Sequence, residues 1–437
     1  MKNHFFQLKG RIFRPTVRNT LSWLSDLNNL PNNKLRDLHE RRRTKMVLHA
    51  FENTDFYHEK YTAAGLTRAD LARPENFREL PVLTREEVRV NFDAMISRDI
   101  SPEEIGRSST GGSTGSPIEI GTDPRLALEV ISWRRLNYWG ASPGDNSGYI
   151  YRVIPSGIGH FARRVFFYPT RRSYLSATQM SDANIAGFVD EILRSRAVYL
   201  VAYVGALKIL ADYVLNNDIR LPHLKFIWST AAPLPVYLRN ELEAVFNVPV
   251  YSQYGSAEFY WIASERRDRV GLDVDWDIRS VEILDGEKQH VLAGSYGDLF
   301  VSDLCNCAFP LLRYEIGDRG RFLPASNDHA DSLPILDFVR GRTSDTFLLR
   351  NGRRVPGEFW TTIFDPYADA ISGFSVHQRQ DRSIIVGFTP NKTWSGDLER
   401  ELAATIQSIC EDTPFELKAH SETRNDRGKL QYITSEI

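Results

Sequence analysis

The chain has 437 residues, more than one hydrophobic core usually organises, so the length predicts two or more domains. Hydrophobic residues make up 42% and charged residues 25%, as in ordinary globular proteins, and the formal net charge is -2. This balance indicates neither nucleic acid nor an anionic membrane as a partner.

Cysteine content and apolar runs indicate the compartment. The three cysteines are too few for a disulfide framework, which favours a reducing environment. The first residues hold no long apolar run typical of a signal peptide. The longest apolar run, residues 197–207, is too short to span a bilayer. We therefore expect a cytoplasmic protein.

The predicted elements begin with helices. Residues 35–53 have the spacing of an amphipathic helix with a strongly charged face. Thr84 is placed to cap a second helix that starts at Arg85, with Glu87 in the position of a capping box. After a glycine-rich stretch, residues 125–138 predict a third helix.

Apolar strands and helical stretches then alternate, which predicts βαβ units and a largely parallel sheet. The strands and the helix of this part span residues 197–204, 224–228, 236–246 and 248–252. A second unit starts near residue 345, with a strand over 383–388 and a helix over 397–410. The predicted fold class is α/β, with a large N-terminal domain (1–344) of mostly parallel sheets flanked by helices and a small α+β C-terminal domain (345–437).

The glycine-rich stretch 108–117 reads SSTGGSTGSP. Its glycines let backbone N–H groups turn toward a common point, and its hydroxyls add donors, which suits a polyphosphate. A flexible Gly/Ser linker is the alternative. No Gly-Lys-Ser/Thr ends the stretch, so it is not a Walker loop.

Four further short motifs follow. Tyr254–Glu258 comes just after a predicted strand, where α/β sheets bind ligands, and its carboxylate suits a divalent cation. In Arg313–Asp318, a glycine turn precedes an aspartate able to accept both hydroxyls of a ribose. The last two are Gly341–Asp345 and Arg427–Lys429. Taken singly, each also fits an ordinary turn or a solvated surface residue.

In order and spacing the five motifs resemble the adenylate-forming superfamily of acyl-CoA synthetases, from about residue 45 to residue 429. The loop form Thr-Gly-Gly-Ser-Thr-Gly and the short length look like the phenylacetate–CoA ligase branch, including its CapK-like members. Residues 51–57 (FENTDFY), 80–84 (LPVLT) and 303–314 point to the same branch.

The resemblance implies a role for each motif. Glu258 would be a catalytic residue as the Mg²⁺ carboxylate, Lys429 the catalytic lysine, and Asp345 the hinge about which a mobile C-terminal lid turns. Candidates for the acid pocket are Tyr203, Val204 and Ser229, the first two by position only. The implied ATP-binding residues are Ser109, Thr110, Gly111, Gly112, Ser113, Thr114, Gly115, Ala231, Tyr254, Gly255, Asp318 and Arg342.

The implied chemistry is attack of a carboxylate on the α-phosphate of ATP. Mg²⁺ and a lysine neutralise the charge that builds up, and no general base is needed because the carboxylate is already ionised. The acyl-adenylate is then captured by coenzyme A, with release of AMP and pyrophosphate, or alternatively by an amine. The expected partners are a small carboxylic acid and CoA or an amine, with no nucleic acid and no membrane, for a monomer or homodimer.

Two features depart from or add to the family pattern. Many superfamily members carry a lysine just before the loop's proline, where this chain has Ser116, so one cation near the phosphates is missing. The bulky run Phe259-Tyr260-Trp261 follows Glu258. Such rings line the acyl pocket or pack against the sheet; we expect two of the three to pack and leave the third open.

Overall fold

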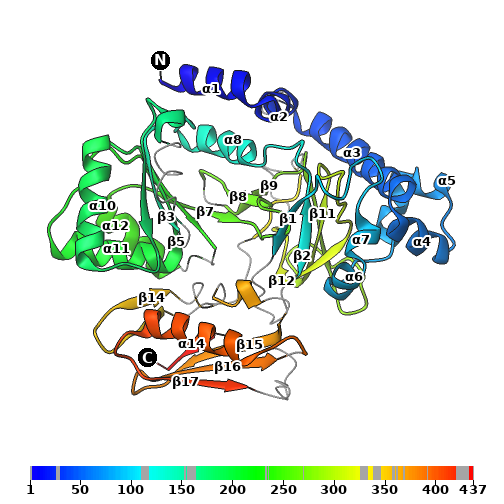
Figure 1. Ribbon diagram of the computed structural model, residues 1–437. Helices are drawn as coiled ribbons and strands as arrows, with labels where there is room; N and C mark the ends of the chain where they lie inside the picture. Colours follow the sequence, from blue (N-terminus) through cyan, green and yellow to red (C-terminus); the bar gives the residue numbers. More distant parts are fainter. Residues whose placement is uncertain are drawn as a thin grey trace.

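The computed structural model describes most of the chain. Figure 1 shows N-terminal helices along one side, two sheets in the middle and the C-terminal strands on the opposite side. Among the residues described, no helix is both long and apolar enough to cross a membrane. The described residues are 2–25, 30–109, 118–151, 154, 164–231, 234, 236–268, 270–324, 333–337, 346–356, 360, 363–367, 370–390, 392–419 and 433–436.

The largest sheet has seven strands in the order β4-β3-β5-β6-β7-β8-β9. Neighbours from β4 to β7 are parallel, and β8 and β9 extend the sheet with antiparallel pairs. This confirms the predicted fold class. The strands are β3 (Ser147–Tyr151), β4 (Arg172–Ser176), β5 (Tyr199–Tyr203), β6 (Phe226–Thr230), β7 (Val250–Tyr254), β8 (Ala263–Glu265) and β9 (Leu272–Val274).

Three helices cover one face of this sheet, as Figure 1 shows beside β3 and β5. They are α10 (Asp182–Ser195), α11 (Val204–Asn216) and α12 (Val236–Phe246). Alternate strand residues such as Leu200 and Ile227 form a buried apolar core with them. The bounds of α12 are those predicted from its spacing, because its apolar residues recur on one side.

The opposite face of the sheet is aromatic. Tyr199, Phe226 and Tyr251 lie there, and Trp139 of α8 (Glu129–Trp139) stacks on Tyr251 with ring centroids 5.2 Å apart. The same core includes Phe6 of α1 (Lys2–Phe13), and α2 (Pro15–Ser25) also contributes to it. The N-terminal helices are therefore packed into the large sheet's aromatic layer.

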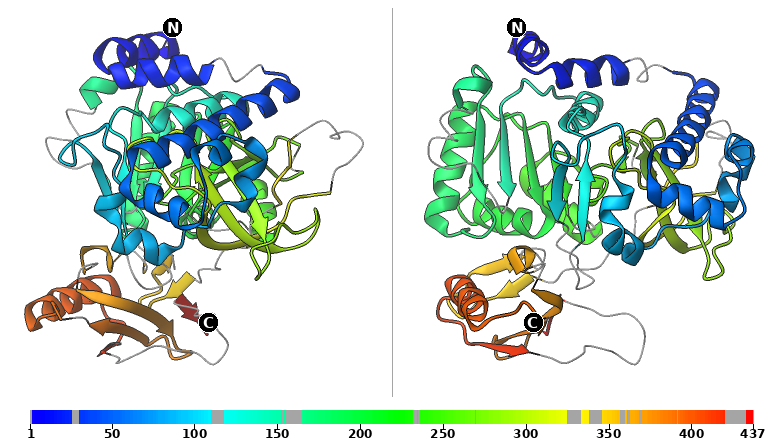
Figure 2. Two further views of the ribbon diagram at one scale, coloured as in Figure 1. Left: turned by 90° about the vertical axis from the view of Figure 1, so that its right-hand side faces the viewer. Right: turned by 45° about the vertical axis from the view of Figure 1, so that its right-hand side comes forward.

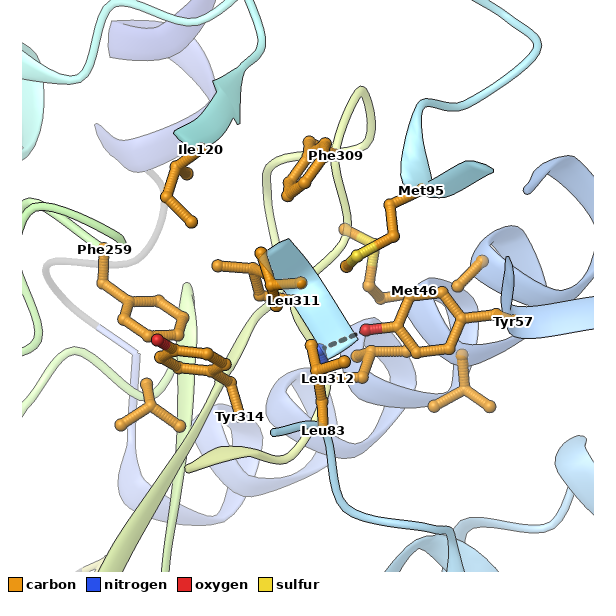
Figure 3. Close-up of a cluster of buried hydrophobic side chains, with 14 of the residues drawn as sticks. Met46, Tyr57, Leu83, Met95, Ile120, Phe259, Phe309, Leu311, Leu312 and Tyr314 are labelled. Carbon is orange, nitrogen blue, oxygen red and sulfur yellow. Dashed lines mark hydrogen bonds between the residues drawn. The ribbon is translucent and has the colours of Figure 1, made fainter. Parts of the chain in front are cut away.

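A second core joins helices to a three-stranded antiparallel sheet and a two-stranded ribbon. The strands are β10 (Arg279–Leu284), β11 (Gly297–Asp303) and β12 (Tyr314–Gly320), with β1 (Gly106–Ser109) and β2 (Glu119–Thr122) in the ribbon. Figure 3 shows its centre, where side chains from the helices meet Leu311 and Leu312. The helices are α3 (Asn32–Asn53), α4 (Asp55–Ala63), α5 (Arg68–Leu71), η1 (Pro74–Glu79), α6 (Arg85–Val90) and α7 (Phe92–Met95).

Two helix predictions in this part are confirmed. The helix expected over 35–53 is α3, three residues longer at its start. Thr84 caps α6, and the side chain of Glu87 accepts from the Thr84 backbone, which completes the predicted capping box.

The C-terminal residues have a core of their own, in which Trp360 and α14 (Gly396–Cys410) pack on a four-stranded sheet. The sheet order is β17-β16-β15-β18, and a hairpin of β13 and β14 lies beside it. The predicted domain boundary at residue 345 lies outside the described residues and stays a prediction. The strands are β13 (Thr346–Leu348), β14 (Arg354–Pro356), β15 (Ile371–Gln378), β16 (Ile384–Pro390), β17 (Phe415–Ala419) and β18 (Ile433–Ser435), and η3 (Asp365–Tyr367) precedes β15.

The first prediction concerns Tyr57, which is fully buried in the core of Figure 3. Its hydroxyl donates to Pro310 O (3.1 Å) and accepts from Leu312 N (2.9 Å). Tyr57→Phe leaves that buried N–H without its acceptor, so we expect a loss of about 1–3 kcal/mol in the free energy of unfolding. Denaturant unfolding measures this loss.

Tyr138→Phe is the control for Tyr57→Phe. The Tyr138 hydroxyl accepts from Arg267 N at an exposed position, where water can take its place. Equal losses in both variants would contradict the account.

The second prediction concerns buried His39, whose Nδ1 lies 2.6 Å from Trp276 O. Burial lowers the pKa of His39 to about 4, the bond to Trp276 opposes the shift, and Arg43 adds to it. Between that pKa and the ordinary value near 6.5 the unfolded chain binds more protons than the folded one. Stability should therefore fall as pH drops through this window, by on the order of 3 kcal/mol in total. His39→Gln should flatten the curve, and an unchanged pH profile of unfolding would refute the assignment.

Candidate active site

The predicted ligand-binding residues gather at one edge of the large sheet. Strands β5, β6 and β7 are adjacent and parallel, so their carboxyl ends, at Tyr203, Thr230 and Tyr254, lie along the same edge. This is the edge at which open α/β sheets bind ligands. Ala231 follows directly after β6 with a left-handed φ of 73°, so the chain turns sharply there.

The turn after β7 requires a glycine. A Cβ on Gly255 would lie 2.2 Å from Tyr260 O and 2.3 Å from Gln253 Nε2, closer than any real contact. The absence of a side chain lets the loop fold back, with Tyr260 N donating to Ser256 O. The Ser256 hydroxyl is buried and has no hydrogen-bond partner among the described residues. Buried hydroxyls are usually hydrogen-bonded, so the Ser256 hydroxyl is an unmet donor beside this turn.

Tyr254 and Asp318 meet across the edge of the sheet. The Tyr254 hydroxyl donates to Asp318 Oδ2 at 2.9 Å. Burial raises the pKa of Tyr254 well above its ordinary value, and the Asp318 carboxylate raises it further, so the phenol stays a donor. The bond holds the carboxylate in one orientation.

Asp318 lies inside a strand, not after a turn as predicted. It belongs to β12, whose pairing with β11 is irregular between Asp298 and Phe300. Gly317 has a φ of 84° within this irregular stretch, which only glycine adopts without strain. The glycine therefore marks a β-bulge that redirects the neighbouring side chain.

Glu258 lies in a second cluster, with Arg85 and Tyr314. Arg85 Nη1 and the Tyr314 hydroxyl both lie 3.3 Å from Glu258 Oε1, and the Glu258 side chain is only 7% exposed. Burial, and then Glu258, raises the pKa of Tyr314, while Arg85 opposes the shift. A protonated phenol and a guanidinium thus fix one oxygen of the carboxylate.

Arg85 was not among the residues predicted from sequence. Backbone bonds position it: Leu83 N donates to Arg313 O, and Glu315 N donates to Leu83 O, each at 2.9 Å. This bridge places the start of α6 beside β12. The capping motif located the helix, but nothing local links Arg85 to a carboxylate 173 residues away.

The second cluster suits Mg²⁺. Both contacts of Glu258 use Oε1, so among the described residues Oε2 is the oxygen left for a cation. No group of three or more acidic, histidine or cysteine side chains in the described part of the chain is arranged to hold a metal. Mg²⁺ commonly takes one or two carboxylates and completes its shell with water and substrate phosphates, which fits a single carboxylate.

A buried arginine supports the segment that follows Glu258. Arg279 is fully buried, and its guanidinium donates to Phe259 O (2.6 Å), Trp261 O (2.8 Å) and Asp303 Oδ1 (2.8 Å). Phe259 and Trp261 are buried, while Tyr260 is 42% exposed. This confirms the prediction that two of the three aromatic residues pack.

The three residues predicted for the acid pocket have different surroundings. The Tyr203 ring, at the end of β5, lies 5.5 Å from that of Tyr151 and also packs against the core formed with the three covering helices. Ser229 is fully buried, and its hydroxyl donates to Tyr251 O. Val204 is buried in the core with the three covering helices. The pocket role of all three stays a prediction.

Several predicted residues lie outside the described part of the chain. Ser109 is the last residue of β1, and its backbone pairs with Glu119. The predictions for the residues after it in the loop, and for the later motifs, remain predictions. They are Thr110, Gly111, Gly112, Ser113, Thr114, Gly115, Ser116, Arg342, Asp345 and Lys429.

Comparison with known proteins confirms the resemblance to adenylate-forming ligases of the phenylacetate–CoA ligase and CapK branch. The chain is 25% identical to Protein CapK of Staphylococcus aureus over 327 residues, covering 72% of this chain and 70% of that protein. It is 24% identical to the phenylacetate-coenzyme A ligase of Escherichia coli (strain K12) over 340 residues, covering 74% and 75%. No protein-family model matches the chain.

A solved structure has the same fold. The 2-hydroxyisobutyryl-CoA ligase in complex with 2-HIB-AMP and CoA, in its thioesterification state, superposes with a TM-score of 0.64 at 19% identity. The match covers 93% of this chain and 91% of that one, so the shared architecture includes the C-terminal residues.

The third prediction tests the turn after β7. Gly255→Ala forces Tyr260 O or Gln253 away from their present places, so we expect a loss of about 1–3 kcal/mol in stability. Gly286→Ala is the control, because a Cβ there meets nothing within 4 Å. Denaturant unfolding of both variants measures the difference. Comparable stabilities would show that the loop relaxes freely and that the close approach is unimportant.

Proposed function

We propose that the protein uses ATP to convert a carboxylic acid to an acyl-adenylate and then transfers the acyl group to coenzyme A, releasing AMP and pyrophosphate. The observation that carries this proposal is the pair of carboxylate clusters at the carboxyl edge of the parallel sheet, Tyr254–Asp318 and Arg85–Glu258–Tyr314. Two oriented carboxylates there suit the ribose and the metal of one nucleotide. The curated relatives named phenylacetate-coenzyme A ligase support the reaction.

In this proposal Asp318 accepts the two ribose hydroxyls. Tyr254 already donates to one of its oxygens, so the carboxylate meets the ribose in a fixed orientation and loses little freedom on binding. The Tyr254 ring lies beside the adenine, and Ala231 and Gly255 line the same edge. Ser109 to Gly115 wrap the phosphates, and Arg342 assists near the ribose or phosphate.

Glu258 holds Mg²⁺ in this proposal, and the ion would neutralise charge on the phosphates. Ser116 leaves the phosphate loop without its usual lysine. Arg85 supplies a fixed positive charge beside Glu258, and its hydrogen bond keeps one carboxylate oxygen occupied. Lys429 would neutralise the charge that develops when the acid's carboxylate attacks the α-phosphate.

The two half-reactions need two arrangements of the same chain. We propose a lid of residues 345–437 that turns about Asp345, carries Lys429 to the nucleotide for the first step and then withdraws it. The separate apolar core around Trp360 and α14 supports motion of these residues as one body. Withdrawal of the lysine would open the site to the thiol of coenzyme A.

Coenzyme A is the proposed acceptor. The relatives named for a reaction are CoA ligases, and the solved relative binds 2-HIB-AMP together with CoA. An amine acceptor, left open by the sequence, is not favoured by these comparisons. The cytoplasm, which supplies ATP and CoA, is the proposed location.

The fourth prediction is ATP–pyrophosphate exchange in the presence of Mg²⁺ and one class from a panel of aryl and alkyl acids. Adding CoA should then yield acyl-CoA and AMP. Lys429→Ala should lower exchange by at least about a hundredfold, because it removes a cation at the developing charge.

Lys418→Ala is the matched control, since this lysine on β17 is partly exposed and pairs with Glu416. If Lys429→Ala exchanges as fast as the control, the lysine assignment is wrong. If acids in the panel stimulate exchange but CoA is not acylated, the acceptor assignment fails while adenylation stands.

A further inference from the structure

Exposed apolar side chains gather at one place on the molecule. Thirteen large hydrophobic side chains are exposed among the described residues, and seven of them lie in α1 or in residues 164–169. The seven are Phe5, Leu8, Ile12, Phe13, Val165, Phe166 and Tyr168.

Helix α1 presents two apolar faces, and the body of the protein covers only one. Phe6 packs edge-on against Trp133 of α8, with ring centroids 5.3 Å apart, and Gly10 lies against Val17. Phe5, Leu8 and Ile12 follow the i, i+3, i+7 spacing and form a stripe on the other face. They are 45%, 48% and 61% exposed.

The two segments form one patch. Lys9 Nζ donates to Phe166 O (3.1 Å) and to Tyr168 O (3.0 Å), which ties α1 to the second segment. Phe6 also stacks on Phe167 at 5.9 Å. Direct contacts therefore hold α1 beside residues 164–169, so their exposed side chains belong to neighbouring segments.

The two chain segments that form this patch carry charges of one sign. Residues 2–25 contain five lysines and arginines and no aspartate or glutamate, although the whole chain has a net charge of -2. Residues 164–172 add three arginines and again no acid, although Arg172 is stacked over the Phe167 ring and has a buried Nε. Arg14 pairs with Glu129, whereas Arg11 and Arg18 are exposed. The patch is locally cationic in a chain that is nearly neutral.

We infer that this patch binds the surface of an anionic membrane, with α1 lying in the plane of the interface. An apolar stripe flanked by lysine and arginine is the pattern of helices that insert one face at the headgroup boundary, while the cations meet anionic lipids. Phe5, Leu8 and Ile12 enter the acyl boundary. The sequence predicts no membrane partner because the net charge is near zero and no segment is long enough to span a bilayer. A helix that lies in the interface requires neither a high net positive charge of the whole chain nor a spanning segment.

The position of the patch leaves the C-terminal residues away from the lipid. In Figures 1 and 2, α1 lies on the side of the molecule opposite the C-terminal strands. A membrane on this side would therefore leave the proposed lid in water. The inference does not depend on the proposed reaction.

The fifth prediction is co-sedimentation of the full-length protein with vesicles of phosphatidylcholine and phosphatidylglycerol. Vesicles of phosphatidylcholine alone should bind much less, and high salt should release the protein from the anionic ones. The double variant Leu8→Ser/Ile12→Ser should bind at least about tenfold more weakly, because two apolar side chains no longer leave water.

The matched control is Leu215→Ser/Leu292→Ser, which removes two apolar side chains exposed elsewhere, 63% and 82%. It should bind as the unchanged protein does. Circular dichroism and thermal unfolding check that both double variants are folded. An equal loss of vesicle binding in the two double variants would overturn the inference. So would a wild-type protein that stays in the supernatant with every kind of vesicle.

Light scattering in the absence of lipid measures the oligomeric state and so tests whether a second copy of the chain covers the patch. A dimer that Leu8→Ser/Ile12→Ser dissociates, together with no vesicle binding, would assign the patch to a second copy of the chain and overturn the inference. A monomer that ignores vesicles would overturn it too and would leave an acidic protein as the partner to seek.

Discussion

The candidate site depends on one fully buried ion pair, Arg279–Asp303. Arg279 joins the three-stranded sheet to the segment just after Glu258, because its guanidinium binds the carbonyls of Phe259 and Trp261 as well as the carboxylate. A buried guanidinium is costly unless its donors are met, and removing one partner of such a pair commonly costs about 3–5 kcal/mol. The position of residues 259–261 relative to the three-stranded sheet is therefore closely defined. The position of Glu258 is fixed as a result, because the turn at Gly255 constrains its loop on one side and the Arg279–Phe259 hydrogen bond constrains it on the other.

Much of the architecture could be predicted because its signals are local. The apolar spacing of residues 236–246 located α12, and Thr84 with Glu87 located the start of α6. The alternation of apolar strands and helical stretches predicted the α/β fold class. The prediction that Asp318 follows a turn was wrong because strand pairing sets the local geometry. Gly317 lies in a bulge that forms because β12 pairs irregularly with β11.

Other features could be recognised only in the folded structure. Some join residues that are far apart in the sequence, and one is hidden when charge is summed over the whole chain. The contact between Arg85 and Glu258 spans 173 positions, and a backbone bridge at Leu83 creates it. Ser229 matched the family pattern, yet the alternation of side chains along β6 turns it away from the aromatic face. Net charge also concealed the cationic N-terminal helices, because acids elsewhere in the chain cancel them.

The aromatic layer has a consequence for how the molecule opens. Phe6 of α1, Trp133 and Trp139 of α8, and Tyr199 and Trp228 of the large sheet belong to one continuous core. Segments that share a core tend to lose protection from amide hydrogen exchange together, as a single cooperative unit. The N-terminal helices and the aromatic side of the sheet should thus open in one event. Anything that steadies α1 on its outer face would also slow the exchange of amides in β5 and β6, which end at the candidate site.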